Sequence, residues 1–424
     1  MTQILEKIDG VLCFDGAPIP ELASKYDTPL YVISERRIRE NYRRVRQALA
    51  KEYDSVRIYY SAKANTSLCV LRILENEGAY LDAVSLGEIF LAKAAGFSPG
   101  RILFTGTSVR DDELRHILKS KVTINIDSIS QLDRLLKAAV PERLSFRINP
   151  EFGAGHHEHC ITAGRAAKFG LWEDDVPTVY SKAKEAGVKL FGIHMHIGSG
   201  IMSAEAYLIA TQKLLEVAKR VHDETGIEFE FIDIGGGMGI PYKLGEEAFD
   251  LNRFAHGMCD LYKQRTREYG LGQPILCVEP GRYIVGDACI LVTRVNTVKK
   301  TPYKKFAGVD AGFNTLMRPV MYGAYHHILV AKEGTGEEET YDVAGPICES
   351  GDLLAKDRRL LRVEEGDLLV ILNTGAYGYS MSSQYNSRPR AAEVLVQDGR
   401  HALIRKRETM RDLRKGQMLA EWLR

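Results

Sequence analysis

Apolar and polar positions follow two alternating patterns over most of the chain. Between residue 34 and about residue 285, short runs rich in β-branched and aromatic residues alternate with stretches whose apolar residues recur every three or four positions. The first pattern is typical of strands and the second of amphipathic helices. The helical pattern is clearest in two sets of residues: Ile38, Tyr42, Val45 and Leu49, and then Tyr207, Leu214, Val217 and Val221.

The alternation predicts a (β/α)8 barrel of the TIM type, because a strand followed by a helix recurs about eight times. We expect its strands at Val56–Ser61, Ala79–Val84, Arg101–Thr105, Val122–Asp127, Leu144–Asn149, Leu190–His196, Phe229–Ile234 and Ile275–Glu279. A doubly wound open sheet alternates in the same way and is the structural alternative. Barrels carry their chemistry where the strands end. Those ends hold Lys63, Ser85, Arg147, His196, Gly235 to Gly237 and Glu279.

A second, β-rich domain is predicted after about Val285, where the alternation stops. Strand-like runs occur there at Cys289–Val298, Lys305–Val309, His327–Val330, Asp367–Leu372, Ala392–Val396 and Ala402–Arg405. Two early runs, Val11–Cys13 and Pro29–Ile33, are expected to join them. We therefore expect a barrel domain over residues 34–285 and a β domain, of sandwich or barrel type, over 1–33 and 286–424. The tail from Met410 to Trp422 is weakly helical in pattern.

Composition narrows the class of protein. The 424 residues carry 57 Lys and Arg against 56 Asp and Glu, a net charge of +1, which argues against a general nucleic-acid or anionic-membrane binder. No apolar run is long enough to span a bilayer, and the first residues lack the apolar core of a signal peptide. The seven cysteines are dispersed without a CxxC pair, which is typical of reduced thiols and predicts a cytoplasmic location.

The first candidate reactive residue is a lysine at the end of the first predicted barrel strand. Lys63 stands among small residues in Tyr60-Ser61-Ala62-Lys63-Ala64-Asn65, and residues 65–67 offer N-caps for a following helix. A lysine in this position suits a nucleophilic amine that must approach a flat cofactor. The alternative is a solvated surface lysine.

A glycine-rich turn follows another strand, in Asp233-Ile234-Gly235-Gly236-Gly237-Met238-Gly239. Backbone N–H groups of such a turn can hold a phosphate, because no Cβ blocks close approach. The turn is not a dinucleotide fingerprint, since Ile240 stands where a third glycine is needed, and it lacks the Gly-Lys-Ser/Thr of a P-loop. The alternative is a tight turn without a ligand.

Histidines end the preceding strand, in His194-Met195-His196-Ile197-Gly198-Ser199-Gly200. Alternation places His194 and His196 on one face, so a metal pair is conceivable. No third ligand has convincing spacing, the loop histidines His156, His157 and His159 lack a partner set, and we expect no metal. One histidine at the barrel mouth can instead stack on a flat ring, with Ser199 on a phosphate.

Further candidates lie at the last barrel strand and in the β domain. In Glu279-Pro280-Gly281-Arg282 the carboxylate can keep a pyridine nitrogen protonated, although a surface salt bridge is the alternative. Arg318, in a segment that leads to Tyr322, has the fork that suits a substrate carboxylate. Three more candidates are the thiol and carboxylate of Cys348 and Glu349 and the phenol of Tyr377.

Together these motifs resemble the alanine-racemase-like (fold-type III) pyridoxal-phosphate enzymes and, within them, the diaminopimelate decarboxylase family. The resemblance covers about Leu30 to Leu403 and keeps the order of seven motifs. It implies pyridoxal 5'-phosphate as cofactor, bound covalently by Lys63 with His196 stacked on the ring. It also implies a cofactor site of Ser199, Gly236, Gly237, Glu279, Gly281, Arg282 and Tyr377.

For the reaction, the resemblance implies decarboxylation of meso-2,6-diaminopimelate to L-lysine in a homodimer with shared active sites. Substrate is expected on Arg282, Arg318, Tyr322, Glu349 and Tyr377. Cys348, reaching the site of a partner subunit, is the expected proton donor. Racemases of this class typically have an arginine in the position of Glu279, so the carboxylate favours decarboxylation.

The sequence alone leaves alternative functions open. Gly106-Thr107-Ser108-Val109 and Gly200 depart from the pattern common in the family. A decarboxylase of another basic amino acid, of the ornithine or arginine type, or of a carrier-tethered one is therefore the second enzyme hypothesis. Arg318 argues against the ornithine type, whose pocket needs acidic groups alone. The non-enzyme hypothesis is a pyridoxal-phosphate carrier or a partner-binding relative.

Overall fold

The structure is a computed structural model that describes residues 4–155, 157, 162–165, 167–332 and 336–423. Its chain divides into two compact units. The barrel unit comprises Ile38–Pro241 and Glu247–Ile284, and the β unit comprises Met1–Arg37, Tyr242–Glu246 and Val285–Arg424. None of the helices among the described residues combines the length and the apolar composition that a membrane span requires.

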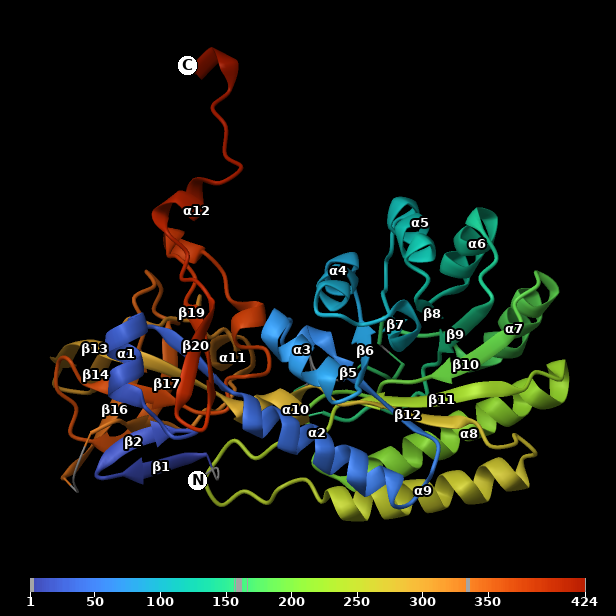
Figure 1. Ribbon diagram of the computed structural model, residues 1–424, viewed down its shortest axis with the longest axis horizontal. Helices are drawn as coiled ribbons and strands as arrows, with labels where there is room; N and C mark the ends of the chain where they lie inside the picture. The colour runs from blue at the N-terminus through green and yellow to red at the C-terminus, as the bar shows by residue number, and fades with distance from the viewer. Residues whose placement is uncertain (1–3, 156, 158–161, 166, 333–335, 424) are drawn as a thin grey trace. The chain divides into compact units, whose positions relative to one another are not determined.

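In the described part of the barrel unit, eight parallel strands close into a ring in the order β10-β11-β12-β5-β6-β7-β8-β9 (Figure 1). Their bounds are β5 (Val56–Ser61), β6 (Tyr80–Ala83), β7 (Ile102–Phe104), β8 (Thr123–Ile126), β9 (Arg143–Arg147), β10 (Leu190–His194), β11 (Phe229–Gly236) and β12 (Ile275–Glu279). The pairings of β12 with β5 and of β9 with β10 complete the ring. The predicted barrel is confirmed, and the open sheet is excluded.

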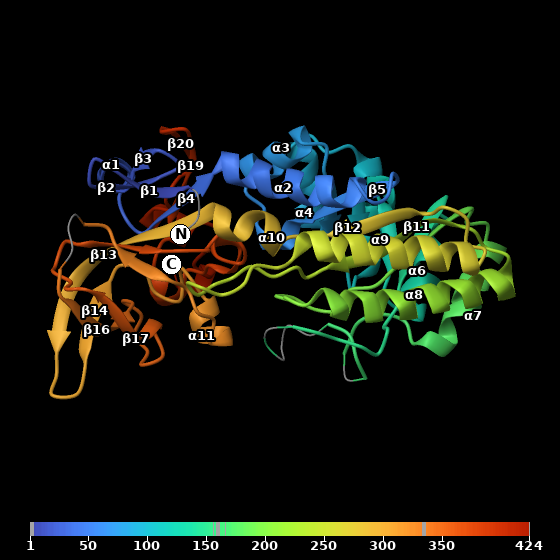
Figure 2. The same ribbon diagram turned by 90° about the horizontal axis from the view of Figure 1, so that it is seen from below.

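Helices follow the strands around the barrel, with α8 and α9 side by side in both views (Figures 1 and 2). Their bounds are α2 (Glu35–Ala50), α3 (Leu68–Asn76), α4 (Leu86–Ala94), α5 (Asp111–Ser120), α6 (Ile129–Ala138), α7 (Val176–Glu185), α8 (Ala204–Thr225), α9 (Leu251–Glu268) and α10 (Arg282–Val285). The two apolar faces predicted from the sequence are buried in α2 and α8. These helices therefore form because the apolar stripe can pack on the strands.

Side chains fill the barrel. Tyr59, Leu103, Phe231 and Cys277, from strands that are not all neighbours, form one buried cluster. Gly192 leaves room for this packing, because a Cβ there would lie 2.2 Å from the ring of Phe231. Apolar packing leaves the C-terminal ends of the strands for polar side chains.

The β unit contains a mixed sheet with the main order β17-β16-β14-β13-β4-β19-β20, in which β18 pairs with β13 and β15 with β18. The bounds are β4 (Leu30–Ser34), β13 (Cys289–Lys300), β14 (Lys305–Val309), β15 (Ile328–Val330), β16 (Glu338–Ala344), β17 (Leu353–Leu361), β18 (Leu368–Ile371), β19 (Ala392–Gln397) and β20 (Arg400–Arg405). A smaller sheet of β1 (Leu5–Ile8), β2 (Val11–Phe14) and β3 (Ala17–Pro18) precedes α1 (Ile19–Tyr26). The short helices are α11 (Arg318–Tyr322) and α12 (Met410–Arg414).

Three features of the β unit differ from the sequence prediction. Strands β16 and β17 were missed, because charged residues occupy many of their exposed positions and weaken the apolar alternation. The run Val11–Cys13 belongs to the small sheet, although the side chain of Leu12 shares a core with residues of the large sheet. The tail is helical only at α12 and in a 3-10 turn at Glu421–Leu423.

Candidate active site

Lys63 lies in a single 3-10 turn, Ala62–Ala64, immediately after β5. Its Nζ donates hydrogen bonds to Asp82 Oδ2 at 2.5 Å and to Ser61 Oγ at 3.3 Å. The small neighbours Ser61, Ala62 and Ala64 are buried, so Lys63 is the residue of this turn whose side chain stays partly accessible. The predicted cap of the next helix takes a different form: Asn65 Oδ1 accepts the N–H of Ser67, and the Ser67 side chain makes no capping bond to α3.

Asp82 is a residue of this site that sequence reasoning missed. It lies in β6, is buried, and holds Lys63 through one oxygen, while Oδ1 has no hydrogen-bond partner among the described residues. Burial raises the pKa of Asp82, the charge of Glu279 raises it further, and the ion pair with Lys63 opposes both. Only one signal was available in the sequence, namely an aspartate within an otherwise apolar strand.

Glu279 ends β12 and forms the centre of a second buried group. Its Oε1 lies 3.3 Å from Nε2 of His194, without hydrogen-bond geometry, and its Oε2 lies 3.9 Å from Nδ1 of His196. Burial alone would raise the pKa of Glu279, but contacts with His194 and the charge of Lys63 lower it to about 2. Glu279 is therefore an anion at neutral pH.

His196 lies just beyond the end of β10, not within it as predicted. Its Nδ1 accepts the backbone N–H of Gly236 at 3.1 Å. Burial, together with the positive charges of Lys63 and Arg147, lowers the pKa of His196 well below its usual value. A neutral imidazole thus stands beside the glycine turn.

The glycine turn is closely packed against neighbouring backbone. A Cβ would lie 2.3 Å from Met195 O at Gly235, 1.8 Å from Glu279 O at Gly236, and 2.3 Å from Gly198 O at Gly237. The φ angles of Gly235 and Gly237, +73° and +104°, are also ones that L side chains rarely adopt. These contacts explain why the sequence has three consecutive glycines here.

Ser199 and Arg282 lie together at the same end of the barrel, where Arg282 Nη2 donates to Ser199 Oγ at 3.1 Å. Arg282 is buried. Gly281 precedes it, and a Cβ there would lie 3.0 Å from the Cβ of Ser61, beside the Lys63 turn. A hydroxyl and a guanidinium side by side are groups that bind phosphate.

Ser85 and Arg147 are two other polar residues that the sequence places at strand ends. Ser85 caps α4 by accepting the N–H of Glu88 at 3.2 Å. Arg147 is buried with its guanidinium 4.4 Å from the ring centre of Phe169.

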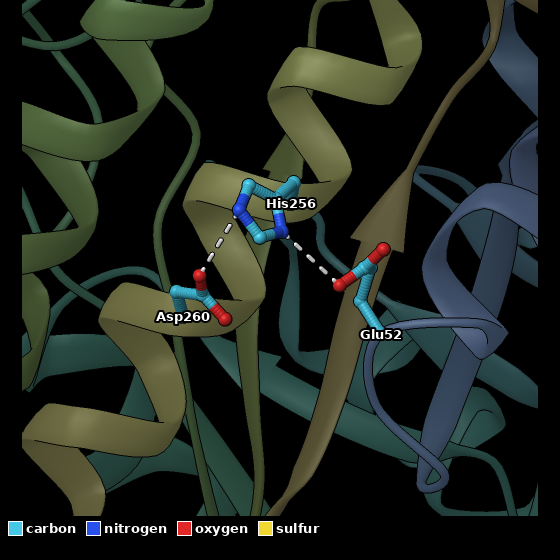
Figure 3. A group of neighbouring side chains, drawn as sticks. All are labelled: Glu52, His256 and Asp260. Atoms are coloured by element: carbon cyan, nitrogen blue, oxygen red, sulfur yellow. Dashed lines mark hydrogen bonds and ion pairs between the residues drawn. The ribbon is translucent and has the colours of Figure 1, made fainter.

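Among the residues that the structure describes, two clusters contain possible metal ligands. Closure of the barrel places Asp233 and Glu279 beside His194, neighbours that sequence spacing did not reveal. The second cluster is exposed: His256 Nδ1 lies 3.2 Å from Glu52 Oε2, and its Nε2 lies 3.3 Å from Asp260 Oδ2 (Figure 3). Each ring nitrogen of His256 thus faces its own carboxylate. His156 and His159 lie outside the described residues, as does Cys160.

The β unit holds the other residues predicted for the site. Arg318 begins α11 and is buried, and Tyr322 is one turn further along the same helix. Cys348 and Glu349 are exposed, and Glu349 accepts a hydrogen bond from Tyr385 Oη. Tyr377 has a φ of +58°, which is unusual for a large side chain.

Comparisons with known proteins identify the family. The model of the pyridoxal-dependent decarboxylase, pyridoxal binding domain, matches residues 35–286. The diaminopimelate decarboxylase of Methanothermobacter thermautotrophicus is 58% identical over 411 residues, which are 96% of each chain. The chain belongs to the diaminopimelate decarboxylase family. The family resemblance seen in the sequence is confirmed, and the protein is a pyridoxal-dependent decarboxylase.

Other members of the diaminopimelate decarboxylase family support the same assignment. The enzyme of Archaeoglobus fulgidus is 40% identical and covers 98% of this chain and 99% of its own. The crystal structure of diaminopimelate decarboxylase from M. jannaschii in complex with L-lysine has a TM-score of 0.93 at 34% identity, covering 99% of both chains. A lysine/ornithine decarboxylase from Vibrio vulnificus, at 22% identity and a TM-score of 0.78, shares the fold.

The barrel residues fit pyridoxal phosphate, the cofactor of this family. Lys63 offers an amine next to a buried carboxylate. Glu279 offers an ionised carboxylate whose Oε1 makes no hydrogen bond within the described chain. The glycine turn, Ser199 and Arg282 offer backbone, hydroxyl and guanidinium groups for the phosphate.

Proposed function

We propose that this protein decarboxylates meso-2,6-diaminopimelate to L-lysine and CO2, the step that completes lysine synthesis. The observation that carries the proposal is the 58% identity, over 96% of each chain, to a protein named diaminopimelate decarboxylase. A buried arginine, Arg318, favours this substrate over ornithine, because diaminopimelate has a second carboxylate and ornithine does not.

In the proposed cofactor site, Lys63 would hold pyridoxal phosphate covalently, and the carboxylate of Glu279 would accept a hydrogen bond from the protonated ring nitrogen. The neutral imidazole of His196 stacks on the ring without adding charge. The phosphate would be held by backbone and side-chain groups of Ser199, Gly236, Gly237, Arg282 and Tyr377, and Gly281 belongs to the same cofactor site. Bound pyridoxal phosphate supplies an electron sink for the charge left at Cα when CO2 leaves.

In the proposed substrate site, Arg318 and Tyr322 bind the distal carboxylate and Glu349 binds the distal ammonium. Arg282 and Tyr377 assist at the other end of the substrate. Cys348 Sγ donates the proton that replaces CO2 at Cα, a general-acid step worth about 10²–10⁴-fold in rate.

We further infer a homodimer in which Cys348 and Glu349 complete the site of the partner subunit. Both residues are exposed on the β unit of the single chain. Exposure in a single chain is what we expect of residues that act in the site of a second chain. The six described cysteines are thiols, which supports a reducing, cytoplasmic location.

The proposed activity is tested by incubating the holoenzyme with meso-diaminopimelate, L-ornithine and L-arginine and measuring CO2 and the amine product. We expect L-lysine from diaminopimelate and at most slow turnover of the others. Lys63→Ala should abolish turnover, and substitution of Lys219, a partly exposed lysine on α8 that pairs with Asp223, by Ala should not. Absence of L-lysine with the loaded wild-type protein would refute the proposal.

The shared site is tested by mixing two inactive variants. Lys63→Ala and Cys348→Ala proteins, unfolded and refolded together in equal amounts, should recover about a quarter of wild-type activity. Half of the dimers are then hybrids, and one of the two sites in each hybrid is intact. Recovery of no activity would contradict sharing of Cys348 between subunits.

A further inference from the structure

A buried histidine in the β unit contacts the proposed substrate-binding arginine. His326 lies just before β15 and is 0% exposed, and Arg318 is 1% exposed. His326 Nε2 is 2.8 Å from Arg318 Nη1, and His326 Nδ1 is 2.8 Å from the backbone oxygen of Leu372. The imidazole therefore bridges a guanidinium and a carbonyl.

The two partners determine the tautomer of this imidazole. A carbonyl oxygen can only accept a hydrogen bond, so Nδ1 of His326 carries the hydrogen and donates to Leu372. A guanidinium can only donate, so Nε2 must be the unprotonated nitrogen and accept from Arg318. His326 is thus neutral, and a proton on Nε2 would place two donors against each other.

The aromatic ring of Tyr242 packs against both Arg318 and His326. The guanidinium carbon of Arg318 lies 4.7 Å from the ring centre of Tyr242. That ring also meets the ring of His326 edge-on, at 5.2 Å between centres and 81° between planes. A guanidinium over an aromatic face, with one N–H directed at an imidazole nitrogen, has little freedom to rotate.

We propose that His326 is a positioning residue that orients Arg318 toward the distal carboxylate of the substrate. This inference rests on the proposed function, in which Arg318 binds that carboxylate. The neutral imidazole uses one of the five N–H donors of the guanidinium and, being tied to the Leu372 backbone, sets the plane of the others. His326 thereby contributes to selection of substrates that carry a distal carboxylate.

The experiment compares two ligands that differ only in that carboxylate. L-Lysine has it, and cadaverine (1,5-diaminopentane) lacks it. Calorimetric titration of the holoenzyme gives the Kd of each ligand for wild type, His326→Leu and His326→Gln. The matched control is His327→Leu, since the adjacent histidine contacts Tyr325 and not Arg318.

We expect His326→Leu to raise the Kd of L-lysine and the KM of diaminopimelate about tenfold, because a hydrogen bond of a charged donor is misdirected. The Kd of cadaverine should change less than twofold. His326→Gln should recover most of the loss, since its amide can accept from Arg318 and donate to Leu372. His327→Leu should leave the ratio of the two Kd values unchanged.

Equal weakening of both ligands, or no change in either, would overturn the inference. If His326→Leu does not fold, His326→Asn replaces it, because its shorter amide cannot reach both partners and the ratio of Kd values should still fall. The proposed function is tested separately by turnover of diaminopimelate in the wild type. Loss of ligand discrimination without wild-type turnover would refute the function and leave the role of His326 supported.

Discussion

The charge state of Glu279 leads to a prediction about acid stability. Glu279 is 2% exposed, and its pKa is lowered from 4.5 to about 2 because His194, Lys63 and His196 outweigh burial. A carboxyl group whose pKa is lower in the folded than in the unfolded protein stabilises the fold above its unfolded pKa. That stabilisation is lost as the pH falls from about 4.5 toward about 2.

The size of the effect follows from the two pKa values of Glu279. Each pKa unit corresponds to about 1.36 kcal/mol, so the difference between 4.5 and about 2 adds roughly 3 kcal/mol to the free energy of unfolding at pH 7. About 2 kcal/mol of this is lost by pH 3. The lowered pKa of His196 acts in the same direction at higher pH, since protonation below about 6.5 favours the unfolded chain.

The assay is urea unfolding of the cofactor-free protein at pH 7 and pH 3, followed by circular dichroism. From pH 7 to pH 3, the free energy of unfolding should fall by about 2 kcal/mol more in the wild type than in Glu279→Gln. The control is Glu338→Gln, an exposed glutamate in an ion pair with Arg359, which should follow wild type. Identical pH dependence in wild type and Glu279→Gln would refute the assignment of the low pKa to Glu279.

The same variant tests the catalytic role of the charge. Since the carboxylate of Glu279 is ionised throughout the physiological range, it can stabilise a protonated ring nitrogen. We expect Glu279→Gln to lower kcat of the holoenzyme about 10²–10³-fold, the typical cost of removing one aligned electrostatic partner. Unchanged kcat would mean that the ring nitrogen does not depend on this charge.

Three further predictions concern single residues. Arg282→Met should raise the Kd for pyridoxal phosphate about 10–100-fold in a spectroscopic titration, because Arg282 is the charged group proposed to bind the phosphate. Arg359→Met, at an exposed arginine, should leave this Kd unchanged. Arg318→Met should raise the KM for diaminopimelate about 10–100-fold, and an unchanged KM would contradict its role in binding the distal carboxylate. Gly237→Ala should lower the free energy of unfolding by about 1–3 kcal/mol or more, since its Cβ would lie 2.3 Å from a carbonyl oxygen at a φ of +104°. Gly270→Ala is the matched control, because Gly270 also has a positive φ but a Cβ there would meet no atom within 4 Å. It should lower the free energy of unfolding by less in the same denaturant titration.

The sequence by itself determined the architecture of the barrel and the positions of its reactive groups. Strand and helix periods are local properties of the chain, so β5 and β12 could be located from their residues alone. Parallel closure then requires that the residues after each strand lie at one end. Lys63 and Glu279 were therefore predictable as members of one site. The order of the motifs was sufficient for the family.

Only the tertiary structure decided which side chains meet. Asp82 pairs with Lys63 because β6 lies beside β5 in a particular register, and no local pattern specifies that pairing. Likewise, His326 faces Arg318 because the backbone of Leu372, which follows β18, fixes one side of its ring. Partner choice depends on contacts between segments distant in sequence, whereas periodicity reports only which face of each segment is buried. The folded chain therefore sets the protonation states and orientations from which the chemistry follows.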